Sequence, residues 1–154
     1  MATVSIINKE MIVKSIQETE EFAKDLAGKL KLPAVLALSG ELGSGKTAFT
    51  KFLAKYLGVK ESIISPTFTI INSYKIQNTK YKLIHIDCYR LLNPEKLLDL
   101  GFNDILQDKN SIVVIEWAER VKNFLPKNTL WIEFKHKGEQ EKEINIKKQC
   151  IQIE

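Results

Sequence analysis

The sequence predicts a single α/β domain with a mainly parallel central sheet, a phosphate-binding loop at its centre and an antiparallel hairpin near its C-terminal end. Residues 34–38 are a continuous apolar run, which is typical of a strand buried on both faces. A glycine-rich loop follows, and residues 49–57 then place apolar side chains on one helical face. Residues 130–134 and 144–146 instead alternate, which indicates antiparallel strands.

The glycine-rich loop, residues 40–47, reads G-E-L-G-S-G-K-T and fills every fixed position of the motif G-x-x-x-x-G-K-[ST]. Its glycines let backbone N–H groups approach phosphate oxygens closely. Lys46 would place its ammonium on the terminal phosphates, and the Thr47 hydroxyl would bind a magnesium ion. The alternative is an ordinary glycine turn, but a chance match is expected only about once in two hundred chains of this length.

The segment before this loop is expected to supply edge strands and one helix. Residues 4–7 and 11–13 read either as two short strands or as one ribbon. Ser15 and Glu18 form the pattern S-x-x-E of a capping box, which predicts a helix start. The helix should bury the apolar face made by Phe22, Ala23, Leu26, Ala27 and Leu30.

The segment after the loop contains a second set of strands. Residues 69–76 and 81–86 are β-rich and predict a hairpin, with its turn at residues 77–80. A short helix should begin at Pro94 and end near Gly101, and residues 102–106 suggest another helical turn. Residues 111–117 then form a second strongly apolar strand.

Two carboxylates end apolar strands and are candidates for the magnesium site. Glu116 ends the run 112–115, and Asp87 ends the run 83–86. Ligands of open α/β sheets bind outside the carboxyl ends of the strands, so both would face the loop if their strands are parallel to it. Glu116 is the better magnesium partner, directly or through water, and Asp87 would then orient or activate the attacking water. The alternative is that each carboxylate only caps a strand in solvent.

Four further side chains have two interpretations each. Thr67 would sense the terminal phosphate as switch threonines do, or it is only a turn residue after Pro66. His85 lies inside a strand pattern and is expected to be packed rather than catalytic. Trp117 and Tyr89 are each either a core aromatic or a wall of the site.

Composition and charge place the chain among ordinary single-domain globular proteins. It has 154 residues, of which 44% are hydrophobic and 27% charged, and we expect one domain over residues 1–154. The formal net charge of +4 suits an RNA-linked partner or a polyanionic ligand, and equally suits lysines scattered over solvated faces. Without an apolar run of membrane-spanning length, a secretory signal or a disulfide framework, we expect a cytoplasmic protein.

Four motifs in order give the chain a specific resemblance. Residues 40–47, 65–69, 85–91 and 115–117 together resemble the TsaE family, formerly the YjeE proteins, and the similarity extends over residues 19–120. This family is the bacterial ATPase of tRNA threonylcarbamoyladenosine biosynthesis. The resemblance implies a compact α/β ATPase with a mixed sheet that uses ATP and Mg²⁺.

The same resemblance implies partners and a low intrinsic activity. In this family, TsaB and TsaD transfer threonylcarbamoyl to the tRNA adenosine beside the anticodon, and the resemblance implies that ATP binding and hydrolysis reset their complex between turnovers. The chain would therefore reach tRNA indirectly and would not bind DNA or membranes. The sequence supplies no obvious arginine finger, because Arg90 and Arg120 are its only arginines, so partners should stimulate hydrolysis.

The resemblance also implies roles for individual residues. The expected catalytic residues are Asp87, Lys46 and Thr67. Thr47 and Glu116 would hold the metal. The expected nucleotide-binding residues are Glu41, Gly43, Ser44, Gly45, Lys46, Thr47, Ala48 and Trp117. Residues 15–19 are a weaker candidate for contacts with the base.

Three other functions are compatible with a phosphate-binding loop. A small-molecule kinase commonly clamps phosphate with arginines from a lid, and two arginines make such a lid hard to build. A GTPase would be expected to carry an Asn-Lys-x-Asp run, and residues 8–11 break it at the last position. A nucleotide-binding module without activity would release no phosphate even with its partners.

Overall fold

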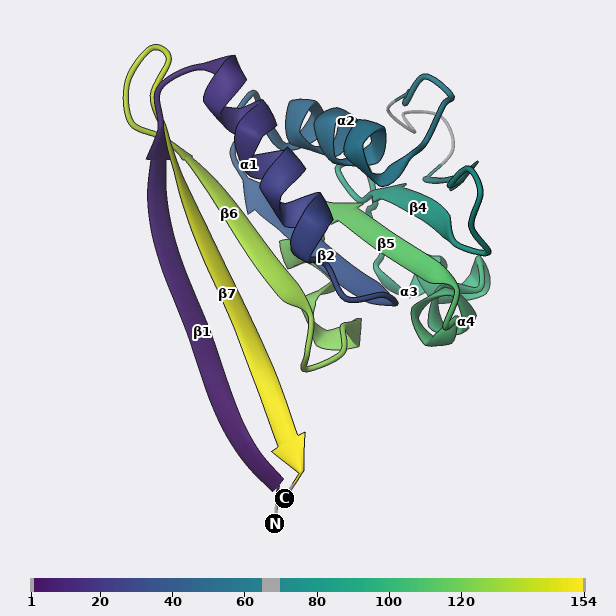
Figure 1. The fold of residues 1–154 in the computed structure, drawn as a ribbon. Coiled ribbons are helices and arrows are strands. Elements are labelled where there is room, and N and C mark those ends of the chain that lie inside the picture. Colours follow the sequence, from purple (N-terminus) through teal and green to yellow (C-terminus); the bar gives the residue numbers. More distant parts are fainter. Residues whose placement is uncertain (1, 65–69, 154) are drawn as a thin grey trace.

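The computed structural model describes residues 2–64 and 70–153, and in this part of the chain helices cover both faces of one seven-stranded sheet (Figure 1). In chain order the elements are β1 (Ala2–Val13), α1 (Ile16–Lys29), β2 (Ala34–Gly40), α2 (Lys46–Leu57), β3 (Ile71–Lys75), β4 (Lys82–Asp87), α3 (Glu95–Asp99), α4 (Phe102–Gln107), β5 (Ser111–Glu116), the 3-10 segment η1 (Ala118–Phe124), β6 (Leu130–His136) and β7 (Lys142–Ile153). The predicted α/β class is confirmed. Thr67 lies outside the described residues.

The strand order is β1-β7-β6-β2-β5-β4-β3, and the sheet is mixed. Its centre is parallel, because β2 pairs in parallel with β5 and β6, and β4 pairs in parallel with β5. The β3–β4 and β6–β7 pairs are antiparallel, as the two predicted hairpins require. Parallel pairing brings the carboxyl ends of β2, β4 and β5 to one edge of the sheet, where the loop lies.

The outer pair of strands is longer than its sequence pattern indicates. Residues 4–7 and 11–13 belong to the single strand β1, which pairs with β7 from Ala2↔Ile153 to Val13↔Lys142. The alternation at residues 144–146 marks only part of β7. The rest of β7 owes its extended form to pairing with β1, a long-range contact that local patterning does not reveal.

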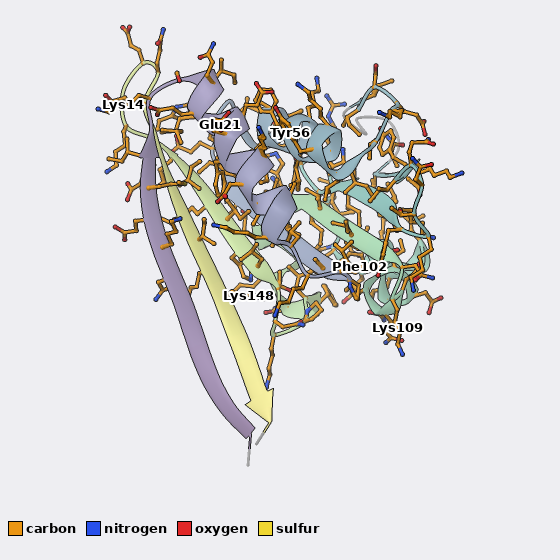
Figure 2. The ribbon with its side chains drawn as sticks, in the orientation of Figure 1. Lys14, Glu21, Tyr56, Phe102, Lys109 and Lys148 are labelled. Atoms are coloured by element: carbon orange, nitrogen blue, oxygen red, sulfur yellow. The ribbon has the colours of Figure 1, made fainter. Side chains whose placement is uncertain are left out.

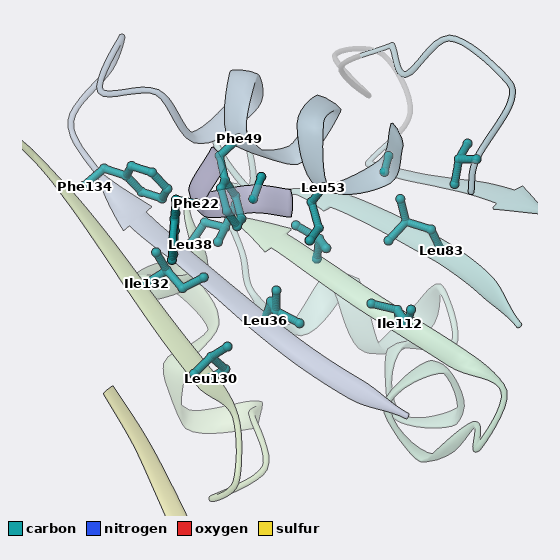
Figure 3. Close-up of a cluster of buried hydrophobic side chains, with 14 of the residues drawn as sticks. Phe22, Leu36, Leu38, Phe49, Leu53, Leu83, Ile112, Leu130, Ile132 and Phe134 are labelled. Carbon is teal, nitrogen blue, oxygen red and sulfur yellow. The ribbon is translucent and has the colours of Figure 1, made fainter. Parts of the chain in front are cut away.

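Two apolar clusters fix the helices to the two faces of the sheet. On one face, α1 and α2 pack on a cluster that includes Leu36, Leu38, Ile112 and Ile132 (Figure 3). On the other face, α3, α4 and η1 cover a second cluster, in which Phe102 is fully buried. Charged side chains such as Lys14 and Lys109 lie on the outside of the molecule (Figure 2).

The start of α1 confirms the predicted cap, with one difference. The Ser15 side chain accepts a hydrogen bond from the Glu18 N–H at 3.2 Å. The Glu18 carboxylate reaches back one residue further than a capping box requires and accepts from the N–H of Lys14. The helix therefore begins where the sequence predicts, with its second cap bond shifted by one residue.

Three aromatic rings connect α1, α2 and β6 beneath the loop. Phe22 stacks on Phe49 with ring centroids 5.3 Å apart, and Phe49 contacts Phe134 at 5.6 Å. Phe49 and Phe134 are almost completely buried. Since each buried aromatic side chain removes a large apolar area from water, this row of rings holds the first turn of α2 against the sheet.

Gly40, the last residue of β2, passes very close to β6. Its φ is +137°, a conformation that side chains rarely adopt, and a Cβ there would lie 2.3 Å from the carbonyl oxygen of Phe134. The neighbouring atom belongs to the backbone and cannot rotate away. Only glycine therefore lets the chain leave β2 and enter the loop at this point.

The close approach at Gly40 predicts the effect of adding one methyl group. We expect Gly40→Ala to lower the free energy of unfolding by about 2–4 kcal/mol, from backbone strain and the clash with Phe134. Gly28 lies inside α1, where an added methyl group would meet no atom within 4 Å beyond its own helix. Gly28→Ala should therefore raise the free energy of unfolding by about 0.5–1 kcal/mol. Urea unfolding of both variants measures the difference. Equal stabilities would contradict the role assigned to Gly40.

Candidate active site

The first turn of α2 presents backbone N–H groups without a protein cap. The helix begins at Lys46 after Gly45, whose φ is 110°, and its N-terminus has neither a side-chain cap nor an acidic residue in the first turn. The N–H of Phe49 makes the first bond back to the Gly45 carbonyl, at 2.9 Å. In the described part of the chain, the N–H groups of residues 46–48 are left for an external acceptor, whereas that of Ser44 donates to the Glu41 carbonyl at 3.1 Å. The helix dipole adds positive potential there. This arrangement suits an anion.

The Lys46 side chain folds back into the loop. Its Nζ donates to the carbonyl oxygens of Gly40, at 2.5 Å, and Glu41, at 2.9 Å, and to the Ser44 hydroxyl at 3.3 Å. Its ammonium also lies 4.1 Å from the centre of the Trp117 ring. The side chain is only 4% exposed. The loop's own oxygens and an aromatic face therefore satisfy this buried cation.

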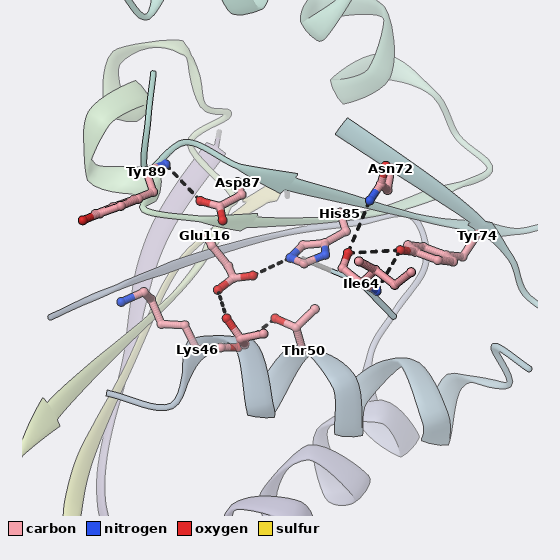
Figure 4. A network of polar contacts seen from close by, with 10 residues as sticks. Lys46, Thr50, Ile64, Asn72, Tyr74, His85, Asp87, Tyr89 and Glu116 are labelled. Atoms are coloured by element: carbon pink, nitrogen blue, oxygen red, sulfur yellow. Dashed lines mark hydrogen bonds and ion pairs between the residues drawn. The ribbon is translucent and has the colours of Figure 1, made fainter. Parts of the chain in front are cut away.

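Thr47 and Glu116 meet across the space between α2 and β5. The Thr47 hydroxyl donates to Glu116 Oε1 at 2.7 Å. The other carboxylate oxygen, Oε2, lies 2.5 Å from Nε2 of His85 on β4. Glu116 is 2% exposed and His85 is fully buried. Figure 4 shows the Glu116 carboxylate between the helix and the histidine ring.

Asp87 stands beside Glu116 at the same edge of the sheet. The two residues are register partners across the β4–β5 ladder. Asp87 Oδ1 accepts a hydrogen bond from the Tyr89 N–H at 2.9 Å. Burial raises the pKa of Asp87, and the negative charge of Glu116 adds to this, while the bond from Tyr89 opposes it. A half-buried carboxyl with a raised pKa is better suited to accept a proton than an exposed one.

The local charges also act on Lys46. Burial lowers the pKa of the Lys46 ammonium, and the negative charges of Glu119, Glu116 and Asp87 oppose that shift. The cation and the carboxylates therefore share one electrostatic environment. A phosphate entering near Lys46 would bring further negative charge to a cation that is already partly desolvated.

Trp117 turns the chain at the end of β5. Its φ of 58° and ψ of 40° lie in the left-handed region, which costs energy for a bulky residue. Its ring lies 5.0 Å from that of Tyr89, between centroids, as well as over Lys46. Backbone strain of this kind at a wall of the site is typical of a functional position.

These groups surround a cavity of about 490 Å³. It is lined by Leu42, Gly43, Ser44, Gly45, Lys46, Thr47, Ala48, Asp87, Tyr89, Arg90, Glu116, Trp117 and Lys142. The structure thus brings together the predicted residues of the loop, both strand-end carboxylates and Trp117. Glu41 contributes its carbonyl to Lys46 and does not line the cavity.

Tyr89, whose sequence position is compatible with a core aromatic or a wall of the site, lines the cavity. Arg90 and Lys142 line it as well, and neither has a role in the sequence-based prediction of the site. Lys142, at the start of β7, donates to the Gly43 carbonyl at 3.2 Å. Arg90 carried a signal, since it lies three residues after the strand-end carboxylate Asp87. Lys142 carried none, because the pairing of β7 with β6 alone brings it to the loop.

His85 is packed, as predicted, and it also contacts a site carboxylate. In the sequence, the two-residue spacing of His85 and Asp87 indicates that His85 lies on the same strand face as a site carboxylate, because residues two apart on a strand share one face. The contact with Glu116 depends on the parallel register of β4 and β5.

The donor set around Thr47 fits a magnesium ion bound together with phosphate. Mg²⁺ in phosphate sites usually takes one or two carboxylates, and phosphate oxygens and water supply the other ligands. The Thr47 hydroxyl and Glu116 supply oxygens at one point, and Asp87 lies on the neighbouring strand. Within residues 2–64 and 70–153, no group of three or more His, Cys, Asp or Glu side chains is arranged to hold a metal.

Comparison with known proteins identifies a consistent set of relatives. Residues 13–144 match the family described as "Threonylcarbamoyl adenosine biosynthesis protein TsaE". The tRNA threonylcarbamoyladenosine biosynthesis protein TsaE of Rickettsia bellii is 35% identical over 144 residues, covering 93% of this chain and 97% of that protein. TsaE of Bacillus subtilis is 38% identical over 130 residues, covering 84% of this chain and 79% of that protein.

A solved structure shares the fold. The crystal structure of YdiB from Bacillus subtilis superposes with a TM-score of 0.76 at 30% sequence identity, covering 94% of this chain and 87% of that one. In the described residues, no helix has the length and apolar character needed to span a membrane.

The raised pKa of Asp87 predicts a pH-dependent stability. A raised pKa in the folded protein means that ionisation of this carboxyl lowers the free energy of unfolding. This loss of stability is absent at pH values below the ordinary pKa of 3.8 and complete at pH values above the raised pKa of the folded protein. Asp87→Asn keeps an acceptor for Tyr89 and removes the charge. We expect it to be more stable than the parent at pH 7, with the difference shrinking as the pH falls toward 4.

Urea unfolding between pH 7 and pH 4 measures this difference. Asp99→Asn, at an exposed position at the end of α3, is the matched control and should show no comparable trend. A variant at position 87 that is less stable than the parent at pH 7 would contradict the assignment.

Proposed function

The chain belongs to the TsaE family of threonylcarbamoyl adenosine biosynthesis proteins, and we propose that it acts there as a magnesium-dependent ATPase. It has a role in the biosynthesis of tRNA threonylcarbamoyladenosine, as its family does. The proposal adds that the candidate active site binds ATP and hydrolyses it, and that hydrolysis supports the TsaB–TsaD complex.

One observation carries the proposal. The Thr47 hydroxyl and the Glu116 carboxylate lie 2.7 Å apart, at the start of the helix that also holds Lys46. A phosphate-binding loop followed by a Ser or Thr, and facing a strand-end carboxylate, is the arrangement with which P-loop nucleotide triphosphatases hold Mg²⁺ and phosphates together.

Phosphate binding requires Lys46 to change partners. Its ammonium now donates to the carbonyls of Gly40 and Glu41, two neutral acceptors within the loop. A charged phosphate oxygen is a stronger acceptor than a carbonyl, so Lys46 can turn toward it at little cost. The free N–H groups of the first turn of α2 would hold the same phosphates in place.

Thr47 and Glu116 would hold the magnesium ion, with Asp87 close by. The ion, when bound, neutralises charge that develops on the phosphate oxygens. Asp87 is on the adjacent strand, with a raised pKa and one carboxylate oxygen fixed by Tyr89. We assign it to orienting the attacking water and accepting its proton. Thr67, the third proposed catalytic residue, remains a proposal from sequence alone.

The arginines support a slow reaction that needs partners. Arg120 donates to the carbonyl of Leu91 at 3.4 Å, a contact within the fold. Arg90 is exposed and lines the cavity. An arginine that stabilises the transition state is worth about 10³–10⁵ in rate. Arg120 is engaged within the fold and Arg90 is exposed, which suits low intrinsic hydrolysis that TsaB and TsaD raise. In this proposal tRNA is reached through that complex, and the protein is cytoplasmic.

Two alternatives are separated by product analysis. A small-molecule kinase would transfer the phosphoryl group to a metabolite, and an inactive binding module would release no phosphate. Incubation with TsaB, TsaD, ATP, tRNA, a threonylcarbamoyl donor and a panel of small metabolites, followed by measurement of free phosphate, modified tRNA and phosphorylated metabolites, distinguishes them. Phosphate release together with modified tRNA supports the proposal, whereas phosphorylation of a metabolite or no release contradicts it.

Lys46→Ala tests the phosphate grip. A hydrogen bond to a charged group contributes about 1.5–3 kcal/mol, so we expect ATP binding to weaken by about 10- to 100-fold. Lys51, one turn further along α2, is exposed, and Lys51→Ala should bind ATP as the parent does. Isothermal titration with Mg-ATP measures both constants. Equal weakening by the two substitutions would show only a general charge effect.

Asp87→Ala tests the role of Asp87 in hydrolysis. Removing a general base typically costs about 10²–10⁴ in rate, and we expect a loss in that range in the presence of TsaB and TsaD. ATP binding should change much less, because Asp87 is assigned to the water. Phosphate release and titration are measured on the same preparation. Normal hydrolysis by the variant would refute this role.

A further inference from the structure

We propose that His85 is a positioning residue, whose neutral ring holds Oε2 of Glu116 so that the carboxylate presents its other oxygen, Oε1, to the magnesium ion beside Thr47. This inference rests on the proposed function, because it concerns how the same site binds Mg²⁺. It goes beyond that function by assigning a role to a buried residue that does not line the cavity.

The strand register makes the contact between the two residues diagonal. His85 pairs with Val114 across the β4–β5 ladder, and Glu116 pairs with Asp87. His85 and Glu116 therefore lie on the same face of neighbouring strands, displaced by two residues. This places Nε2 of His85 2.5 Å from Oε2 of Glu116, with both side chains removed from solvent (Figure 4).

The hydrogen-bond partners indicate which ring nitrogen carries the proton. Nδ1 of His85 is buried and has no hydrogen-bond partner among the described residues. A proton there would leave a buried donor without an acceptor, which is costly. Glu116 Oε1 already accepts from Thr47, as an ionised carboxylate does. The arrangement that satisfies most groups is a neutral ring that donates from Nε2 to Oε2.

A neutral donor has a particular advantage at this position. A lysine or arginine in place of His85 would cancel the carboxylate charge that attracts the metal. The neutral ring fixes one oxygen and leaves the charge in place. Partners of this kind commonly orient a ligand carboxylate or histidine in metal sites.

The nearby cation explains why Glu116 needs to be held. The charge of Glu116 acts on Lys46, as the opposing effects on the Lys46 pKa show. A carboxylate free to rotate toward Lys46 would form an ion pair that removes the metal ligand and the phosphate ligand together. With Oε2 bound to His85 and Oε1 to Thr47, Glu116 stays at the metal position instead.

A purely structural role for His85 makes a different prediction. If the ring only filled space between β4 and α2, an apolar substitute would change stability and leave the magnesium dependence of nucleotide binding unaltered. A positioning role instead makes the donor group decisive. His85→Leu removes the donor, and His85→Gln keeps a neutral amide N–H that can reach Glu116.

The experiment titrates a non-hydrolysable ATP analogue into the full chain with excess Mg²⁺ and again with EDTA, for the parent and both variants. Partners of metal ligands are typically worth about 10- to 100-fold in metal affinity. Mg²⁺ should raise the affinity of the parent for the analogue, and we expect His85→Leu to reduce this gain in affinity by about that factor while leaving the affinity in EDTA unchanged. We expect His85→Gln to restore most of the gain in affinity. An unchanged magnesium gain in His85→Leu would overturn the inference.

A second measurement needs no substitution and applies even if His85→Leu does not fold. The ¹⁵N NMR signals of the imidazoles report the protonated nitrogen, and the exposed His136 is the internal control. We expect His85 to carry its proton on Nε2 and its signal to respond to Mg²⁺ in the presence of the analogue, while His136 does not respond. A proton on Nδ1, or no response of His85, would overturn the inference.

The two proposals fail in distinguishable ways. If the parent itself gains nothing from Mg²⁺, the proposed magnesium-dependent ATPase fails and the role of His85 fails with it. If the parent binds the analogue more tightly with Mg²⁺ and His85→Leu does so equally, the ATPase proposal stands and only the role of His85 is lost.

Discussion

The hydrogen bond between Thr47 and Glu116 is the contact on which the candidate site depends. It joins residues 69 positions apart in the chain, one at the first turn of α2 and one at the tip of β5. The contact exists because β2 and β5 are parallel neighbours and because the rings of Phe22, Phe49 and Phe134 hold α2 on the sheet. The packed core thus sets the distance between the two groups that are proposed to hold magnesium.

The site concentrates features that elsewhere destabilise a fold. Lys46, Glu116 and His85 are polar groups at positions with almost no exposure, and Trp117 has a left-handed backbone. Asp87 lies against a second carboxylate. Such departures from ordinary packing rules, gathered at one edge of a sheet, are expected at a functional site, where the rest of the fold compensates for the lost stability.

Local sequence patterns predicted the central strands and the loop well, because both depend on residues that are close together in the sequence. The apolar runs before Gly40 and Glu116 identified the central parallel strands, and the motif around Lys46 identified the loop. Side-chain contacts across strands were not predictable. The bond from His85 to Glu116 depends on register, and Lys142 reaches Gly43 only through the pairing of β7 with β6. The full length of β1 and β7 likewise came from their mutual pairing.

The most direct test of this account is a crystal structure of the chain with Mg²⁺ and a non-hydrolysable ATP analogue. We predict phosphates enclosed by the loop around Lys46 and a magnesium ion within reach of both Thr47 and Glu116. A structure in which the analogue binds elsewhere, with Lys46 still bound to the carbonyls of Gly40 and Glu41, would contradict the account.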